Sequence, residues 1–495
     1  MAKFPTSFRR NLVIIVIALG IIFRIGQFLY NRSLTEGEAA LALNILQRSY
    51  QDLLKPLAYH QAAPYGFLLI QKFFSNLVGN NDYALRIFPL ICGISSIFLF
   101  YAISQRILTE GSALWGIFLF SFCDHLIYFS SEVKQYSSDV TIGLILIFIA
   151  LSLQNHPKVK QILLLGLAGA ISIWFSHPSL FVFLGCIIAL GIQIIKSKRK
   201  DYFFLILSAV FIWLISFLFN YTLNLKYVSQ NQTLLQTWEK SFMPLPPKSI
   251  ADLKWFCYVF LRLFKNPLGF SIYEITFIAF IFLVGLFIYW QRDRNKLLML
   301  IIPIILALLA SGLKKYPFEG RLLLFIIPLM FWVIAEGLDY IKKIVSSSSH
   351  SLSLMLIAVI LLPTGIAGFY HLFSPRAPEE LRPVISYVRT HKQEGDIIYL
   401  YYASYNSFLY YSRQFGFDEN DYIVGIESRT DCTQYYTDLR RLKGNPRIWF
   451  LFSHVSNIYG VDEEKLFITI LNTLGKKLDA FKAPGAACYL YDLSK

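Results

Sequence analysis

The segment NLVIIVIALGIIFRIGQFLYNRSLTEGEAALALN, residues 11–44, decides the fold class of this chain. Residues 11–30 form a mostly apolar run, and about 20 such residues are the length that an α-helix needs to cross a bilayer. The run is too long for a signal peptide and has no small-residue cleavage site, so we interpret it as a retained span. Two carboxylates, Glu36 and Glu38, follow it closely.

The rest of the chain repeats this apolar pattern. Of its 495 residues, 56% are hydrophobic and only 16% are charged, which is too apolar for a soluble protein of this length. Aromatic residues make up 17%, as expected of membrane helices with interfacial belts. We count about eleven candidate spans, near residues 11–30, 84–106, 111–130, 137–153, 161–176, 178–195, 202–222, 270–290, 297–312, 321–341 and 352–371.

Basic residues predict the orientation of these spans. When the N-terminus is placed in the cytoplasm, every cytoplasmic loop is short and basic, including the run KSKRK at residues 196–200. The long polar segments 31–83 and 223–269 and the tail from residue 372 then lie on the opposite face. The net charge of +15 is explained by loops that face anionic lipids, so no nucleic-acid partner is expected. We expect a multi-pass protein of the plasma (inner) membrane.

Two domains are predicted. Residues 1–371 form an α-helical membrane domain with the polar loops 31–83 and 223–269, and residues 372–495 form an extracytoplasmic α/β domain. In this tail, DIIYLYYA, RIWFLFSHV and ACYLYDL have the apolar character of buried strands, and helical segments alternate with them. Cys432 and Cys488 lie in the tail, where a disulfide is permitted, but spacing alone does not decide whether they pair.

Three groups of polar residues lie at expected turns on the extracytoplasmic face. The first is the pair Glu36 and Glu38, which begins a segment of amphipathic helical spacing. The second is YFSSEVKQYSSDV, residues 128–140, in one very short turn, and the third is LKKYPFEGRLLLFIIP, residues 313–328. We predict that residues of the second and third groups bind substrate, and so does His177, which lies at another turn on this face. The predicted substrate-binding residues are Glu132, Lys134, Gln135, Tyr136, His177, Lys314, Lys315 and Arg321.

The chemistry on offer is that of carboxylates near cations. Ionisable groups close to hydrocarbon are costly and usually functional, and basic residues on the extracytoplasmic face suggest an anionic ligand such as phosphate. A carboxylate that takes a proton from an attacking hydroxyl, with cations that stabilise a departing phosphate, suits an inverting sugar transfer. The structural alternatives are acids that cap a helix, cations that snorkel to the interface, and a histidine that is simply buried.

These residues resemble the GT-C membrane glycosyltransferases that use polyprenyl-phosphate sugars, namely the dolichyl-phosphate-mannose protein mannosyltransferase-like group and the aminoarabinose transferases. The resemblance rests on EGEAALALN, APYGFLLIQK with DYALRIFPLICG, SSEVKQYSSD and PFEGRLLLFIIP, and it covers about residues 10–340. It implies a polyprenyl-phosphate-linked monosaccharide donor and a lipid, glycan or protein acceptor. It also implies a catalytic base in the first loop, at Glu38 or Glu36.

One position departs from that family. The family's first loop usually reads Asp-Glu, and here Gly37 stands at the position of the Asp while Glu38 matches the Glu. Either Glu36 substitutes for the missing acid, or the chain is a non-catalytic relative that binds a lipid-linked glycan. A transporter is a further alternative, although the spans hold few acids at mid-membrane and no inverted repeat is seen. No cofactor motif is present, and the carboxylate pair leaves room for one divalent cation.

Overall fold

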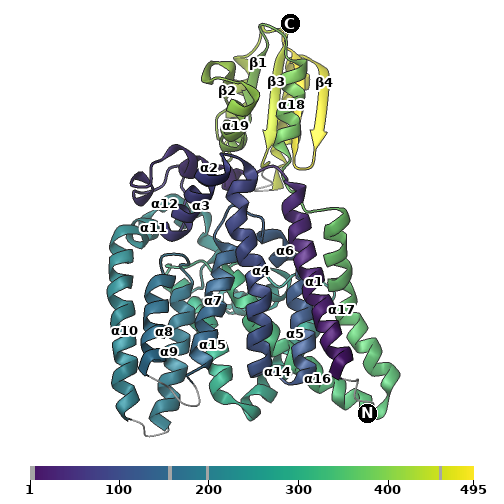
Figure 1. Ribbon diagram of the computed structural model, residues 1–495. Helices are drawn as coiled ribbons and strands as arrows, with labels where there is room; N and C mark the ends of the chain where they lie inside the picture. Colours follow the sequence, from purple (N-terminus) through teal and green to yellow (C-terminus); the bar gives the residue numbers. More distant parts are fainter. Residues whose placement is uncertain (1–5, 154–158, 197–199, 456–459, 495) are drawn as a thin grey trace.

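The computed structural model describes residues 6–153, 159–196, 200–455 and 460–494. It consists of a bundle of long helices that carries a small α/β domain at one end (Figure 1). Helix α1 begins at the opposite end of the bundle from that domain (Figure 1). The bundle helices are α1 (Thr6–Tyr30), α4 (Asp82–Ile107), α5 (Glu110–Phe122), α6 (Asp124–Phe129), α7 (Tyr136–Leu151), α8 (Val159–Ser172), α9 (Ser179–Lys196), α10 (Lys200–Asn220), α14 (Ile275–Arg292), α15 (Arg294–Gly312), α16 (Ile327–Ser348) and α17 (His350–Phe373).

The predicted helical membrane fold with a C-terminal α/β domain is confirmed, and the number of long spans is smaller than eleven. Within the described residues, eight helical segments are long and apolar enough to cross a membrane, and α7 and α8 are shorter apolar helices. The predicted span 111–130 is divided at Cys123 into α5 and α6. The Arg24 guanidinium donates to the carbonyls of Ser121 (3.1 Å) and Phe120 (3.3 Å), so the end of α5 inside the bundle has partners for its carbonyl groups.

The centre of the bundle is the segment Gly320–Ser348. In the most apolar 18-residue stretch of this segment, 94% of the residues are buried. The segment comprises the 3₁₀ turn η4 (Gly320–Ile326) and α16. Helices α14 and α16 pack closely where Gly285 meets Gly337, since a Cβ at Gly285 would lie 2.0 Å from the carbonyl oxygen of Val333. Small residues at such a crossing let two backbones approach, which is how helices pack in a bilayer.

The long loops gather at the end of the bundle that carries the α/β domain (Figure 1). One loop, residues 31–81, contains α2 (Glu36–Gln47) and α3 (Tyr65–Val78). The loop between α10 and α14 contains α11 (Lys226–Gln230), α12 (Gln232–Thr237) and α13 (Ile250–Lys265). Both loops contribute side chains to the cavity at this end of the bundle.

The α/β domain is a five-stranded mixed sheet in the order β2-β1-β3-β5-β4. Strands β1 (Ile397–Leu400), β2 (Tyr422–Val424) and β3 (Ile448–Ser453) are parallel, and β5 (Ala486–Asp492) runs antiparallel to both β3 and β4 (Lys476–Ala483). Its helices are α18 (Leu381–His391), α19 (Tyr405–Ser412), α20 (Thr433–Arg440) and α21 (Glu463–Leu474). Cys432 and Cys488 do not form a disulfide: both thiols are free, and Cys488 is buried on β5.

The α/β domain is fixed to the bundle by buried polar contacts. The Glu380 carboxylate accepts hydrogen bonds from the backbone N–H and the hydroxyl of Ser33, both at 3.0 Å. Asp82, at the start of α4, accepts hydrogen bonds from the hydroxyls of Tyr410 and Tyr411 at 2.8 Å each. These contacts hold the sheet domain directly above the first loop.

Candidate functional site

Helix α2 begins with a capping box that uses Glu38. The Glu38 carboxylate accepts hydrogen bonds from the backbone N–H and the hydroxyl of Thr35, both at 3.0 Å. This arrangement satisfies groups that a helix start leaves free. Glu38 therefore has a structural role as a capping residue of α2.

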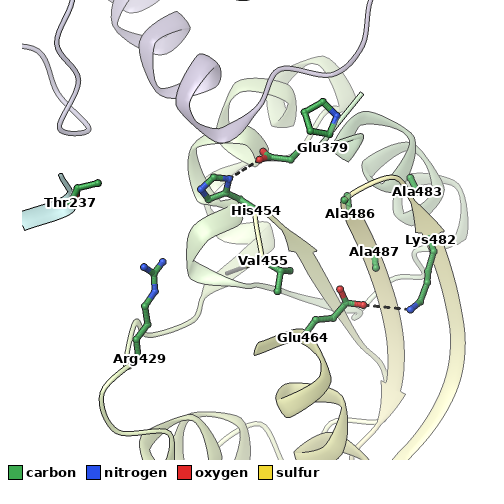
Figure 2. Close-up of a pocket in the computed structure, with 12 residues that line it drawn as sticks. Thr237, Glu379, Arg429, His454, Val455, Glu464, Lys482, Ala483, Ala486 and Ala487 are labelled. Carbon is green, nitrogen blue, oxygen red and sulfur yellow. Dashed lines mark hydrogen bonds and ion pairs between the residues drawn. The ribbon is translucent and has the colours of Figure 1, made fainter. Parts of the chain in front are cut away.

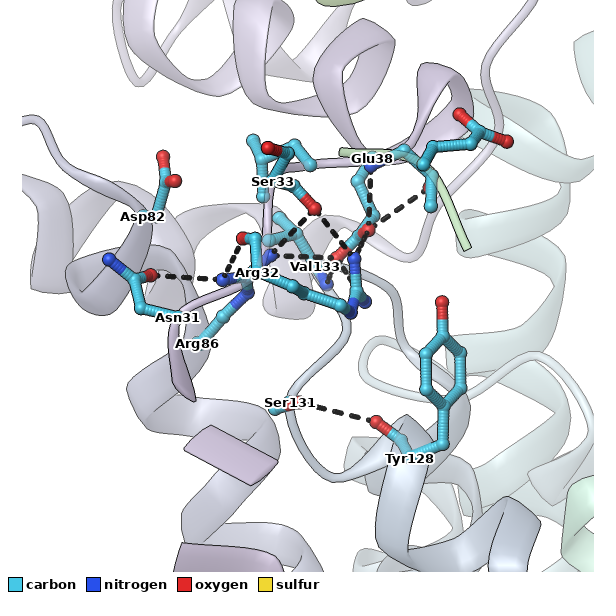
Figure 3. Close-up of polar contacts among 12 residues, drawn as sticks. Asn31, Arg32, Ser33, Glu38, Asp82, Arg86, Tyr128, Ser131 and Val133 are labelled. Atoms are coloured by element: carbon cyan, nitrogen blue, oxygen red, sulfur yellow. Dashed lines mark hydrogen bonds and ion pairs between the residues drawn. The ribbon is translucent and has the colours of Figure 1, made fainter. Parts of the chain in front are cut away.

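The Glu38 carboxylate is also the centre of a buried ion-pair cluster (Figure 3). Arg32 approaches it with both terminal nitrogens, at 2.5 and 3.0 Å, and the backbone N–H of Val133 donates at 2.9 Å. Arg86 lies 3.7 Å away, and the Glu38 side chain is fully buried. Burial by itself raises the pKa of Glu38, but Arg32 and Arg86 outweigh it and lower the pKa to about 2.

Glu38 is therefore a poor candidate for the catalytic base predicted from the sequence. A base with a pKa near 2 holds almost no proton at neutral pH and gives little driving force for proton transfer. Its oxygens are occupied by Arg32, Thr35 and Val133, so an acceptor hydroxyl has no free lone pair to meet. The side chain also does not line the cavity described below.

Glu36 is likewise committed to structure. Its carboxylate accepts hydrogen bonds from the side-chain amide of Asn406 at 2.5 Å and from the backbone N–H and hydroxyl of Ser407 at 3.0 Å. Burial raises the pKa of Glu36. These contacts join α2 to α19 of the α/β domain, so Glu36 serves as a docking group between the two domains.

A cavity of about 290 Å³ opens near the same end of the bundle. Most of the predicted substrate-binding residues meet in its wall, although they come from separate turns of the chain. They are Lys134, Gln135, Tyr136, His177, Lys314, Lys315 and Arg321. The structure thus brings the second and third predicted groups together, whereas Glu36, Glu38 and Glu132 do not line the cavity.

The cations of the cavity differ in their surroundings. Lys134 is buried, and its ammonium donates to the side-chain oxygen of Gln61 at 2.6 Å. Burial, and then the charge of Arg321, lower the pKa of Lys134 to about 8. Arg321 lies over the ring of Trp238, 5.8 Å from its centroid, and over that of Tyr136 at 6.0 Å. The aromatic rings hold the guanidinium in place while its N–H groups stay available.

Two neutral or acidic groups complete the polar lining. His177 lies in the turn between α8 and α9, and burial lowers its pKa to about 4, so it is neutral at pH 7. Its Nε2 has no hydrogen-bond partner among the described residues. Asp139, in the first turn of α7, also lines the cavity, and its buried Oδ1 has no such partner either. These two atoms are therefore buried polar atoms that the described residues leave without a partner beside the cavity.

Glu132 lies behind the cavity wall. Burial, and then the Glu38 carboxylate, raise the pKa of Glu132 to about 7. Its Oε2 is buried without a hydrogen-bond partner in the part of the chain that the structure describes. Because Glu132 does not line the cavity, its expected contact with substrate stays a prediction.

The donor set of the cavity does not fit a divalent cation. Its lining has one carboxylate, Asp139, against the four cations Lys134, Lys314, Lys315 and Arg321. Among the described residues no group of three or more His, Cys, Asp or Glu side chains is arranged to hold a metal ion. A hard cation needs several oxygen ligands and few positive neighbours, and this lining provides neither.

Acids inside a helical bundle can mark a transport pathway, but Asp124 has structural partners. Asp124, at the start of α6, pairs with His371 at the end of α17 and with Arg376 at 3.1 Å. Asp124 and His371 therefore join two helices near the α/β domain.

Sequence reasoning missed a second pocket, of about 650 Å³, between the α/β domain and the loops below it (Figure 2). Its wall includes Glu379, Arg429 and His454 from the α/β domain and Thr237 from α12. Nothing in the sequence marks His454 apart from its place just after a buried strand, so the task of this domain could not be read from the sequence.

Comparisons with known proteins found one similar family and several similar folds. Residues 62–220 match the family model of dolichyl-phosphate-mannose-protein mannosyltransferases. ArnT from Cupriavidus metallidurans, solved with undecaprenyl phosphate, is 11% identical over 97% of this chain and 98% of that chain, with a TM-score of 0.54. The oligosaccharyltransferase AglB from Archaeoglobus fulgidus, solved with an inhibitory peptide and a dolichol-phosphate, is 9% identical. The match covers 97% of this chain and 74% of the AglB chain, with a TM-score of 0.50.

No curated protein sequence matches the chain significantly. The segment 62–220 contains the α6–α7 turn with Lys134 and the α8–α9 turn with His177, so the family match includes part of the cavity wall. At identities near 10% the structural likeness shows the fold, and it extends over nearly the whole chain. The chain therefore has the GT-C fold of ArnT and AglB, and its residues 62–220 are similar to the dolichyl-phosphate-mannose-protein mannosyltransferases.

Proposed function

We propose that this chain is a membrane glycosyltransferase that moves a monosaccharide from a polyprenyl-phosphate donor to a lipid, glycan or protein acceptor. The observation that carries the proposal is the cavity whose wall presents Lys134, Lys314, Lys315 and Arg321. Arg and Lys side chains bind phosphate oxygens through charge-assisted hydrogen bonds. The ArnT structure of the same fold contains undecaprenyl phosphate, which supports a lipid-linked phosphate as the ligand here.

The cavity suits the leaving-group half of an inverting transfer. An acceptor oxygen attacks the anomeric carbon, the bond from that carbon to the phosphate oxygen breaks, and the electron pair leaves with the phosphate. The cations stabilise the charge that develops on the phosphate in the transition state. Gln135, Tyr136 and His177 offer neutral hydrogen-bonding groups on the same wall, and such groups orient a sugar.

The proposed face is extracytoplasmic, with the N-terminus in the cytoplasm. The basic loops support this orientation, because positive residues are retained on the cytoplasmic side. The absence of any nucleotide motif in these loops fits a donor that the membrane itself supplies. Membrane-impermeant thiol labelling of the exposed Cys257, on α13, tests the orientation in whole cells.

Transfer in nanodiscs tests the activity. The full chain is incubated with a panel of radiolabelled polyprenyl-phosphate sugars and a membrane extract as acceptor. We expect label to move from one donor, and unlabelled polyprenyl phosphate to inhibit as a product that fills the cation-lined cavity. Absence of both transfer and polyprenyl-phosphate binding in well-folded protein contradicts the proposal.

One observation favours a second candidate, a non-catalytic protein that binds a lipid-linked glycan. Gly37 lines the cavity without a carboxylate, and both neighbouring acids, Glu36 and Glu38, are occupied by structural contacts. The two candidates share the ligand and differ in turnover. Tight binding of one donor with no transfer to any acceptor in the extract would favour the second candidate.

A further inference from the structure

The 650 Å³ pocket below the α/β domain adjoins the cation-lined cavity. Thr237, at the end of α12, lines both of them. The floor of the pocket on the sheet side is made of small residues, including Ala483, Ala486 and Ala487, while charged side chains stand at its edges (Figure 2). A donor in the cavity and a second molecule in the pocket would therefore meet near Thr237.

His454 is a titratable residue in the wall of this pocket, and its backbone conformation is unusual. It directly follows β3, and its φ of 53° is uncommon for a residue other than glycine. Its side chain is half exposed, and its Nδ1 lies 2.6 Å from Oε1 of Glu379 (Figure 2). Residues held in sparsely populated backbone conformations cluster at functional sites, where the surrounding structure fixes them.

Glu379 connects this histidine to the first loop. Its second oxygen, Oε2, accepts a hydrogen bond of 2.9 Å from the backbone N–H of Glu36, at the start of α2. The next residue, Gly37, lines the cation-lined cavity. The His454–Glu379 pair is thus tied to the backbone that forms the border between pocket and cavity.

The geometry of an inverting transfer places the proton acceptor on the side opposite the leaving phosphate. The cations lie in the cavity, and Asp139, the acid of that cavity, lines it together with them. Glu36 and Glu38 are occupied by other contacts. Among these groups, His454 is the one that lies outside the cavity and carries an oriented ring with its Nε2 side toward open space.

We propose, on the basis of the proposed function, that His454 is the catalytic proton acceptor for an alcohol hydroxyl that binds in the pocket, and that Glu379 is its positioning residue. The acceptor oxygen forms a bond to the anomeric carbon, and the bond from that carbon to the phosphate oxygen breaks. The hydroxyl proton passes to Nε2 of His454, and the electron pair of the broken bond stays on the polyprenyl phosphate. The half-exposed ring then releases the proton to water.

The electrostatic surroundings support this role. The hydrogen bond to Glu379 raises the pKa of His454, and burial opposes this rise. The charge of Glu36 adds to the rise and that of Arg321 opposes it. A carboxylate that holds one ring nitrogen fixes the tautomer and stabilises the imidazolium formed when the other nitrogen takes a proton.

The test compares three variants of the full chain in nanodiscs. H454Q removes the proton acceptor, and E379Q removes the charge that orients it. E380Q is the matched control, because Glu380 accepts hydrogen bonds from Ser33 and lines neither the pocket nor the cavity. We expect H454Q to lower kcat by about 10²- to 10⁴-fold with the donor KM and Tm retained. We expect E379Q to lower kcat less and to move the acid limb of the kcat/KM profile to lower pH.

The control separates chemistry from docking. We expect E380Q to lower Tm while the kcat and acid limb of the folded protein stay as in the wild type. If the wild type transfers sugar and H454Q keeps its kcat, or loses activity only together with Tm, the assignment of His454 is overturned and the proposed function stands. If the wild type transfers from no donor, both are overturned.

Discussion

Arg32 binds the Glu38 carboxylate with both terminal nitrogens of its guanidinium, at 2.5 and 3.0 Å, inside the protein. The two residues are six positions apart and both are fully buried. The contact closes the turn between α1 and α2, and the N–H of Val133 extends it to the α6–α7 turn. A buried, bidentate pair of this kind fixes the first loop above the bundle.

Glu38→Gln is therefore expected to act on stability. The substitution leaves Arg32 and Arg86 without a counter-charge in a buried site, which costs about 3–5 kcal/mol of unfolding free energy. Thermal unfolding in detergent measures the loss. The exposed pair Asp52–Lys55 supplies the control, since Asp52→Asn should leave Tm unchanged. An unchanged Tm for Glu38→Gln together with lost transfer would return Glu38 to the role of base.

The same pair predicts how stability depends on pH. The folded state lowers the pKa of Glu38 from its ordinary 4.5 to about 2. Its contribution is therefore fully present above about pH 4.5 and is lost as the pH falls through about 2. Unfolding free energy measured along this range should fall less steeply in Glu38→Gln than in the wild type. Equal slopes would show that Glu38 is not held as a carboxylate.

Hydropathy predicted the membrane fold because the bilayer demands long apolar helices, and it failed where a distant side chain intervenes. The break at Cys123 depends on Arg24 of another helix, which the local pattern of residues 111–130 does not contain. In the α/β domain, the missed strands β2 and β4 lie at the sheet edges. Strand β4 reads KKLDAFKA, and an edge strand with charged residues lacks the apolar run that marks a buried strand.

The cations of the site could be predicted and the base could not. Lys134 and Arg321 stood out because charges beside hydrocarbon are costly, and both line the cavity. The fate of the first-loop acids depends on their partners. Asn406, which binds Glu36, lies 370 residues further along the chain. No local pattern reveals that such a contact will occupy the carboxylate.

Arg321→Ala should weaken donor binding. Arg321 lies over the rings of Tyr136 and Trp238 and forms no ion pair with another described residue, so its loss removes a charge aimed at the ligand. A hydrogen bond to a charged group contributes about 1.5–3 kcal/mol, which corresponds to a rise of about 10- to 100-fold in the donor KM. Arg440→Ala, on the exposed face of α20, is the control for loss of one positive charge. An unchanged donor KM would remove Arg321 from the phosphate site.

Chelation is expected to leave transfer unchanged. The cavity offers the carboxylate of Asp139 beside Lys134, Lys314, Lys315 and Arg321, and this excess of positive charge repels a divalent cation. Transfer is measured after dialysis against EDTA and again after Mg²⁺ or Mn²⁺ is added. A loss of rate with EDTA that Mn²⁺ restores would show that the donor's phosphate brings a metal into the site.

Gly37 and Lys134 give the most specific prediction about pH. A Cβ at Gly37 would lie 3.8 Å from Cε and 3.9 Å from Nζ of Lys134, which is ordinary contact, so a short side chain fits there. Lys134 has a pKa lowered to about 8, so it loses its proton as the pH rises through that value, and the donor KM should then increase. Gly37→Asp places a carboxylate beside the ammonium and raises its pKa, which moves this increase to higher pH.

Gly37→Asn is the matched control, because it has nearly the same shape and no charge. We expect the donor KM of Gly37→Asn to rise at the same pH as that of the wild type, whereas the donor KM of Gly37→Asp rises at a higher pH. Lys134→Met should have a high donor KM at every pH and no alkaline rise. The KM is measured between about pH 6 and about pH 10, where Lys134 titrates and arginine stays charged. If Gly37→Asp and Gly37→Asn give the same profile, Lys134 is not the group whose charge holds the donor.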